Sequence, residues 1–128
     1  MEDRQATPTV HLSVVEFVEN YLSLIYRRDV SEQARRSWCP EWWKHAEAVV
    51  RLDALWRTWE HYRLIPATGL SIWMLDHADP HMRELFDPEG PFLHCSPTRG
   101  HRDQLPPLPL KSPERGMFGE PLTRSDDT

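Results

Sequence analysis

The chain is short of glycine, cysteine and long apolar runs, and each shortage excludes a class of protein. Of its 128 residues, 5 are Gly and 2 are Cys, against 12 Pro. Proline in excess of glycine predicts stiff, extended segments. No apolar run approaches the ~18 residues of a membrane span, and residues 1–8 lack the apolar core of a signal peptide. We therefore expect a cytoplasmic protein that does not enter membranes.

The chain also lacks an excess of positive charge. Fifteen Lys and Arg face 20 Asp and Glu, giving a formal net charge of −5, and no segment is strongly basic. The field that drives phosphate binding is missing, which disfavours nucleic acid as a partner. Thiols stay reduced in the cytosol, which disfavours a disulfide between Cys39 and Cys95.

Aromatic residues are abundant instead, and they gather at one place. The chain has six Trp, and residues 38–45 alone hold three of them with one Cys and one His. One domain of this size has a modest core, so large side chains matter to it. The cluster therefore predicts the anchor of a core or a structured site.

Apolar residues at helical spacing predict a mainly α fold, a long helical hairpin with one or two short helices. Ser13 and Glu16 form a capping box that opens a first helix. Pro40 suits the first position of a second helix over residues 40–64. A third helix is expected over residues 70–77. Asp79 and Pro80 are then read as the cap and first turn of a fourth helix ending near Phe86.

The predicted organisation is one helical domain over residues 11–110 between two disordered tails, residues 1–10 and 111–128. Residues 105–110 are expected to be extended, polyproline-like backbone laid across the helices by its leucines. The expected core pairs the apolar faces of the first two helices. Its members are Val14, Phe17, Val18, Tyr21 and Ile25 on the first helix, and Leu52, Leu55, Trp56 and Trp59 on the second.

A repeated spacing points to a metal site. Cys39 precedes His45 by the same interval that separates Cys95 from His101. Two cysteines and two histidines can hold a tetrahedral zinc ion. Such a site would fix a Pro-rich segment that has few apolar residues of its own. We predict one zinc ion on these four residues, with His94 as the alternative ligand.

Other interpretations of the same residues stay open. A lone Cys is often a small buried apolar residue. A Cys at a helix N-terminus beside a His can also be a nucleophile. A Cys–His hydrolase also needs an orienting Asn or Asp and an oxyanion hole. The single Asn, Asn20, lies in the middle of the first helix, and no Gly-rich element precedes either cysteine. His77 and His81 are four residues apart, but Pro80 is expected to break the helix between them. His11 and His61 are assigned to packing or the surface.

Four motifs along the chain form a recognisable set. They are Trp38-Cys39-Pro40-Glu41-Trp42-Trp43, His45-x-Glu47-Ala48, Arg51-Leu52-x-Ala54-Leu55-Trp56-Arg57-x-Trp59-Glu60, and Gly90-Pro91-Phe92-x-x-Cys95. With these motifs, roughly residues 13–110 resemble a family of small proteins of unknown function found in actinobacteria and in their phages and plasmids. The resemblance implies a bacterial cytosolic setting, often with mobile elements, and no known activity. The family often has Pro where this chain has Ala46.

The sequence thus favours a non-enzymatic module that binds another protein, in a mobile-element or host-control setting. A small Cys/His enzyme is the first alternative. A DNA-associated accessory factor is the second.

Overall fold

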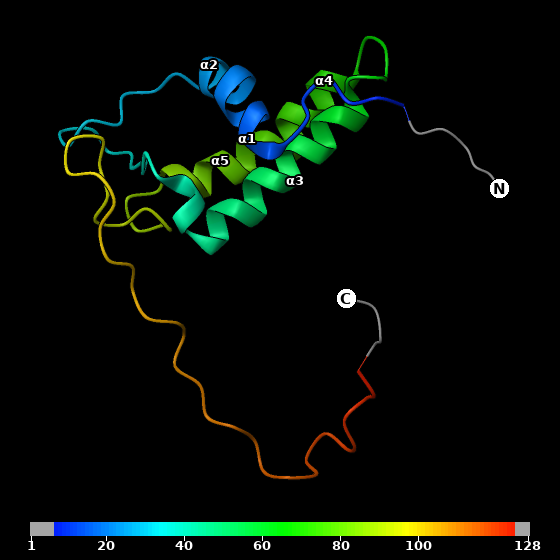
Figure 1. Ribbon diagram of the computed structural model, residues 1–128, viewed down its shortest axis with the longest axis vertical. Coiled ribbons are helices and arrows are strands. Elements are labelled where there is room, and N and C mark those ends of the chain that lie inside the picture. Colours follow the sequence, from blue (N-terminus) through cyan, green and yellow to red (C-terminus); the bar gives the residue numbers. More distant parts are fainter. Residues whose placement is uncertain (1–6, 125–128) are drawn as a thin grey trace.

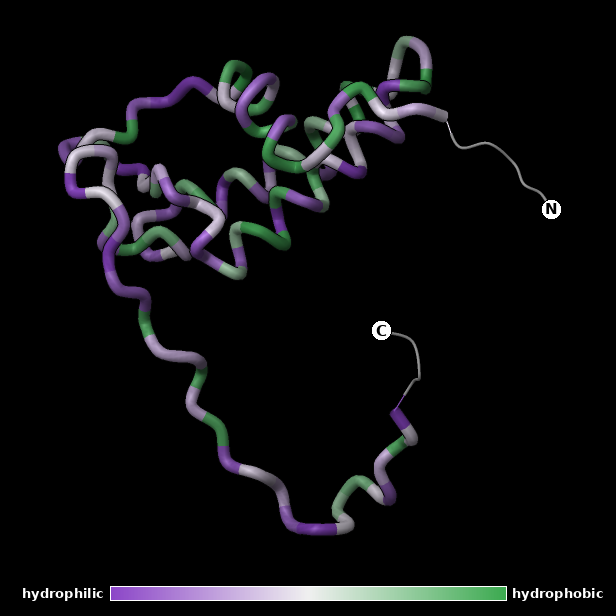
Figure 2. The backbone as a smooth tube through the Cα atoms, viewed as in Figure 1, coloured by the Kyte–Doolittle hydropathy of each residue, from purple (hydrophilic) through white to green (hydrophobic). Residues whose placement is uncertain are grey.

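The computed structural model describes residues 7–124 and confirms a mainly helical protein, with no strand among those residues. A helical body is followed by a segment that leaves it and curves through open space (Figure 1). Green, hydrophobic residues recur along the packed helices, whereas the departing segment carries them singly (Figure 2). None of the helices in the described part is long and apolar enough to cross a membrane.

The first helical run combines three elements: α1 (Val14–Phe17), a π-helical turn (Val18–Leu22) and α2 (Ser23–Ile25). The predicted cap is confirmed, because the Ser13 hydroxyl accepts from the Glu16 N–H at 3.1 Å. The Glu16 carboxylate does not return to Ser13. It accepts from the Leu12 N–H at 2.7 Å instead. The run ends where Tyr26 leaves helical geometry.

The second helix begins later than its sequence predicts. Pro40 is not its first residue; a 3-10 turn (Trp42–Lys44) comes first, and α3 spans Ala46–Tyr62. His45 is extended at the start of α3, and its side chain is buried. Between Cys39 and His45 the chain forms the 3-10 turn, and both of these side chains are buried. A continuous helix from Pro40 is therefore absent.

The predicted third and fourth helices form one continuous run. It comprises α4 (Gly69–Ile72), a π-helical segment (Trp73–Ala78) and α5 (Asp79–Phe86). Asp79 is helical rather than a cap. In a regular α-helix, a proline ring meets the carbonyl four residues earlier. Here the Asp79 N–H bonds to the Met74 carbonyl in the wider π pattern, which makes room for Pro80.

The core involves three helical runs, not two. Helix α3 packs against α1 and against the α4–α5 run. Trp73, from the third run, is fully buried, and its indole N–H donates to the Leu55 carbonyl at 3.1 Å. Trp56, expected at the centre, is only partly buried at the edge. The sequence underestimates the third run because Pro80 predicts a break that the π-helical segment removes.

The opposite face of α3 is solvated, as its charge pattern predicts. Arg51 pairs with Glu47 at 2.9 Å and Arg57 pairs with Asp53 at 2.8 Å. Val50, on the same side, is 69 % exposed.

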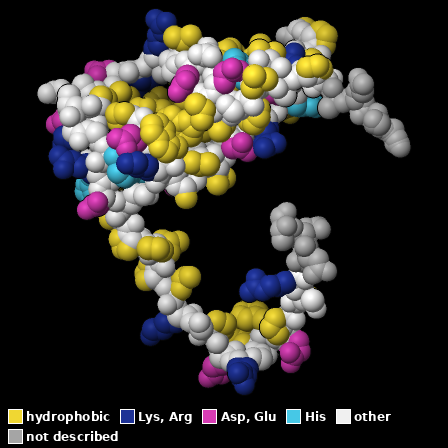
Figure 3. Space-filling model, viewed as in Figure 1, with side chains coloured by type: hydrophobic (Ala, Val, Ile, Leu, Met, Phe, Trp, Pro, Cys, Tyr) yellow, Lys and Arg dark blue, Asp and Glu magenta, His cyan; other side chains and the backbone are white. Residues whose placement is uncertain are grey.

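The two ends of the described chain differ. Residues 1–6 of the predicted N-terminal tail lie outside the described residues, but the next segment is tied down. The N–H groups of Val10 and His11 donate to the Glu60 carboxylate at 3.0 and 2.9 Å. At the other end, the leucines of residues 105–110 do not lie across the helices; Leu108 is 83 % exposed. Figure 3 shows these apolar side chains standing free of the body.

Candidate metal centre

Two loops and one helix start bring the four predicted ligands together. Cys39 lies in the loop before the 3-10 turn, His45 directly precedes α3, and Cys95 and His101 flank a tight loop near the end of the body. Their ligand atoms all lie within 4.8 Å of one another. His94, the alternative ligand, is exposed with a left-handed backbone (φ 78°) and does not belong to the cluster.

The individual contacts pair each cysteine with a histidine. The Cys39 Sγ lies 3.5 Å from Nδ1 of His101, and the Cys95 Sγ lies 3.6 Å from Nε2 of His45. Cys95 and His101 are 4.0 Å apart. Ligands that share a tetrahedral ion with bonds of about 2.0–2.3 Å are separated by about 3.3–4 Å. These spacings suit a small metal ion.

Aromatic packing positions the first two ligands. The Phe92 ring lies edge-on to the His45 ring, with centroids 4.9 Å apart, and edge-on to Trp38 at 5.0 Å. Phe92 is fully buried, as is Cys39. The Trp-rich motif therefore places Cys39 by packing its neighbour Trp38, and the Phe of the Gly-Pro-Phe segment supports His45.

The loop between Cys95 and His101 is closed by backbone hydrogen bonds. The Gly100 N–H donates to the Ser96 carbonyl at 2.7 Å, and Gly100 has φ 75°, which favours glycine. The Glu32 carboxylate accepts from the hydroxyls of Ser96 and Thr98 and holds the loop from outside. This turn returns the chain so that His101 faces Cys95.

The backbone lies close to both sulfurs. The Arg102 N–H donates to the Cys95 Sγ at 3.3 Å, and the backbone of Glu41 lies close enough to Cys39 to oppose the rise in its pKa. Backbone N–H donors stabilise a metal-bound thiolate. They leave no signature in the sequence, because any residue type supplies a backbone N–H, so sequence reasoning does not find them.

The titration of these groups reflects burial. Burial raises the pKa of the Cys39 thiol to about 11, and the neighbouring Cys95 raises it further, while the Glu41 backbone opposes both. Burial also lowers the pKa of His45, and the nearby His101 adds to this effect. Without a metal, these shifts favour the neutral thiol of Cys39 and the neutral imidazole of His45. A divalent cation would have to displace the thiol protons.

One ring nitrogen of His45 faces the cluster. Nε2 lies 3.6 Å from the Cys95 Sγ, whereas Nδ1 is buried and forms no hydrogen bond among the described residues. A metal on Nε2 would need the lone pair of that atom, and the proton of the neutral ring would then be on Nδ1.

The other histidines do not join the cluster. His11 is buried against Phe17 and Trp59, as its packing assignment predicts. His61 is exposed. His81 lies 3.0 Å from the Arg51 guanidinium, and its pKa is lowered by burial and then by Arg51.

Fold and site together define a small helical domain with a buried Cys₂His₂ cluster that can hold a metal ion. Residues 11–114 match the family model described as a domain of unknown function, DUF4913, and the chain belongs to this family. No curated protein and no solved structure matches the chain.

Proposed function

We propose that this protein is a non-enzymatic interaction or regulatory module in which one zinc ion joins the C-terminal loop to the helical body. The observation that carries the proposal is the buried cluster of Cys39, His45, Cys95 and His101. Two thiolates and two imidazoles are a donor set that suits zinc. A closed set of four protein ligands is typical of a structural site, since catalytic zinc keeps a position for water.

The setting forms part of the same proposal. The motif resemblance supports a cytoplasmic protein of actinobacteria or their phages and plasmids, acting on a host or mobile-element process through a protein partner. A reducing cytoplasm would keep both thiols available to the metal.

The Cys/His enzyme has less support. A cysteine nucleophile needs a lowered pKa, whereas burial raises that of Cys39. A helix N-terminus would lower the pKa of a nearby thiol. Cys39 does not lie at one, because the 3-10 turn and the extended His45 separate it from α3. Asn20 is exposed on the first helical run, away from the buried thiols.

Metal analysis of protein purified without a metal-affinity tag tests the proposal. We expect about one zinc per chain, with X-ray absorption distances near ~2.3 Å to sulfur and ~2.0–2.1 Å to nitrogen. Cys39→Ser and Cys95→Ser should each lose the metal and melt at a lower temperature. His94→Ala, beside Cys95 but exposed, is the matched control and should keep it. Metal-free protein, or zinc retained by both Ser variants, would refute the zinc site.

A further inference from the structure

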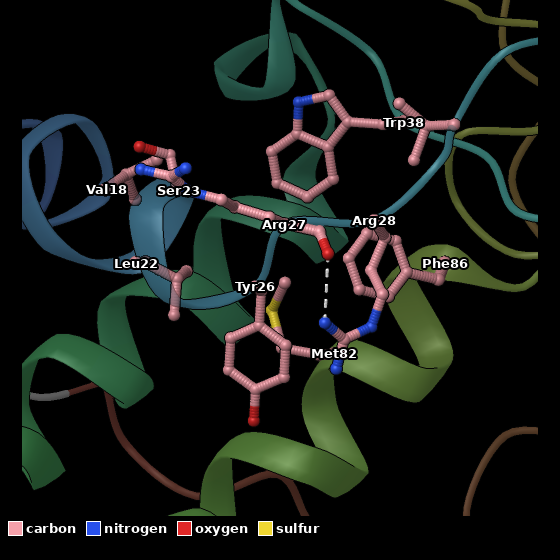
Figure 4. A pocket seen from close by; sticks show the side chains of 10 residues that line it. Val18, Leu22, Ser23, Tyr26, Arg27, Arg28, Trp38, Met82 and Phe86 are labelled. Carbon is pink, nitrogen blue, oxygen red and sulfur yellow. Dashed lines mark hydrogen bonds between the residues drawn. The ribbon is translucent and has the colours of Figure 1, made fainter.

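A second feature of the body lies apart from the metal cluster. It is a half-open cavity of about 320 Å³ between α2, α5 and the loop before the 3-10 turn. Leu22 and Tyr26 come from the first helical run, Met82 and Phe86 from α5, and Trp38 from the loop. Figure 4 shows their side chains around the opening, with Arg28 in front. A cavity of this size and lining suits one large apolar group.

The rim of the cavity is basic. Arg27 and Arg28 line it. A second, shallower hollow shares Phe86 and is lined by Arg35, Arg36 and Arg83. All five arginines are exposed. Among the described residues, none of them forms an ion pair with a carboxylate.

Three nearby carboxylates accept hydrogen bonds from other groups. Asp29 accepts from the Ser31 N–H at 3.0 Å, Asp87 accepts from the Glu89 N–H at 2.9 Å, and Asp79 accepts from the Tyr26 hydroxyl at 2.5 Å. The pKa of Asp29 is lowered by its bonds to Ser31 and, to a smaller extent, by the Arg36 charge. Arg28 is held over the Tyr26 ring, 5.4 Å from its centroid, and donates to the Arg27 carbonyl at 3.1 Å. A protein of net charge −5 thus has two arginines at the apolar cavity and three more at the adjoining hollow.

We propose that this surface binds an acidic segment of a partner protein, with one large apolar side chain in the cavity and flanking carboxylates on the arginines. Arginine binds carboxylates through paired hydrogen bonds, and aromatic walls favour an aromatic anchor. Because arginines line both hollows that share Phe86, they can bind several carboxylates of one peptide, whereas a small anion would contact only one of the two groups. The inference rests on the proposed role as an interaction module but not on the metal.

Nucleic acid fits this surface less well. Val18, Leu22 and Met82 give the cavity apolar walls, which offer no hydrogen bonds to base edges. The negative net charge also opposes a phosphate backbone beyond this patch.

Calorimetric titration of the full chain with synthetic peptides tests the inference. The first peptide carries one Phe between runs of Glu, the second replaces Phe by Ala, and the third replaces Glu by Gln. We expect the first peptide to bind saturably and the other two to bind at least roughly tenfold more weakly. The second peptide lacks the ring that fills the cavity, and the third lacks the charged hydrogen bonds; either loss is expected to reduce the affinity by about this factor. The Trp38 indole resonance should shift on binding.

Variants locate the contact. Arg27→Gln with Arg28→Gln should weaken binding roughly tenfold, and Ser23→Trp, at the exposed rim, should block the cavity. Arg115→Gln with Arg124→Gln removes the same charge from the exposed tail and should change nothing. Unchanged thermal melting of each variant shows that the fold is intact.

Three results would overturn the inference: equal binding of all peptides, equal loss in the tail variant, or displacement of the peptide by duplex DNA at physiological salt. Each titration is run on protein of measured metal content. Peptide binding by metal-free protein would therefore separate this surface from the zinc proposal.

Discussion

Trp73 is the side chain on which the packing of all three helical runs converges. It lies edge-on to Phe17 at 6.3 Å and donates to the Leu55 carbonyl. Trp73→Ala should therefore destabilise the fold by about 3–5 kcal/mol, as expected for a large buried ring. Trp56→Ala should cost less, because Trp56 is only partly buried. Urea unfolding of both variants measures the difference, and a larger loss at Trp56 would contradict this description of the core.

Glu60 is a buried carboxylate that fastens the N-terminal segment. Burial tends to raise its pKa, but the N–H groups of His11 and Val10 and the Arg63 side chain outweigh burial and lower it below 4.5. A lowered folded pKa means stabilisation above the unfolded value and loss as pH falls through the folded one. Glu60→Gln should cost about 1–3 kcal/mol at neutral pH. In acid unfolding curves, the difference in unfolding free energy between the variant and the parent protein should become smaller below pH 4.5. A difference that does not change with pH would exclude a role for the charge.

At the scale of the element, Gly69 sets how closely α4 approaches the end of α3. A Cβ built there would lie 2.0 Å from the Tyr62 carbonyl oxygen and 3.0 Å from the Ile65 Cβ. Gly69→Ala should therefore force the two helices apart and cost about 1–3 kcal/mol. Gly116→Ala, in the exposed tail, is the control and should leave the melting temperature of the body unchanged. Equal melting of the two variants would show that the joint is not tight.

The elements also show what the sequence predicts and what it does not. The Ser13 cap and the ion pairs of α3 follow from local spacing, and the grouping of Cys39 with His101 is indicated only by the repeated interval between Cys and His. The late start of α3 does not, because it results from Cys39 and His45 turning toward ligands 50 or more residues away in the chain. The helix that continues through Pro80 depends on a π-helical segment, which no residue pattern in the sequence predicts. The walls of the arginine-rimmed cavity come from three separate elements, so no motif contains them.

At the scale of the molecule, the proposed metal joins a loop with little regular structure to a helical body with its own core. Chelation should therefore release residues 90–104 first and leave the helices partly formed. Limited proteolysis with and without a chelator should show new cuts between Phe92 and Gln104, while circular dichroism retains most helical signal. Simultaneous loss of both signals would show instead that the helices cannot persist without the ion.

The span of the cluster has a consequence for the route of folding. Cys39 and His101 are 62 positions apart, so closing this loop costs chain entropy that local helices do not pay. The helical runs contain mostly neighbouring residues and can form before that closure. With the proposed zinc ion bound, the last step of folding would then be the capture of Cys95 and His101 by a body that already presents Cys39 and His45. The rate of that step would follow the concentration of free zinc, while helix formation would not.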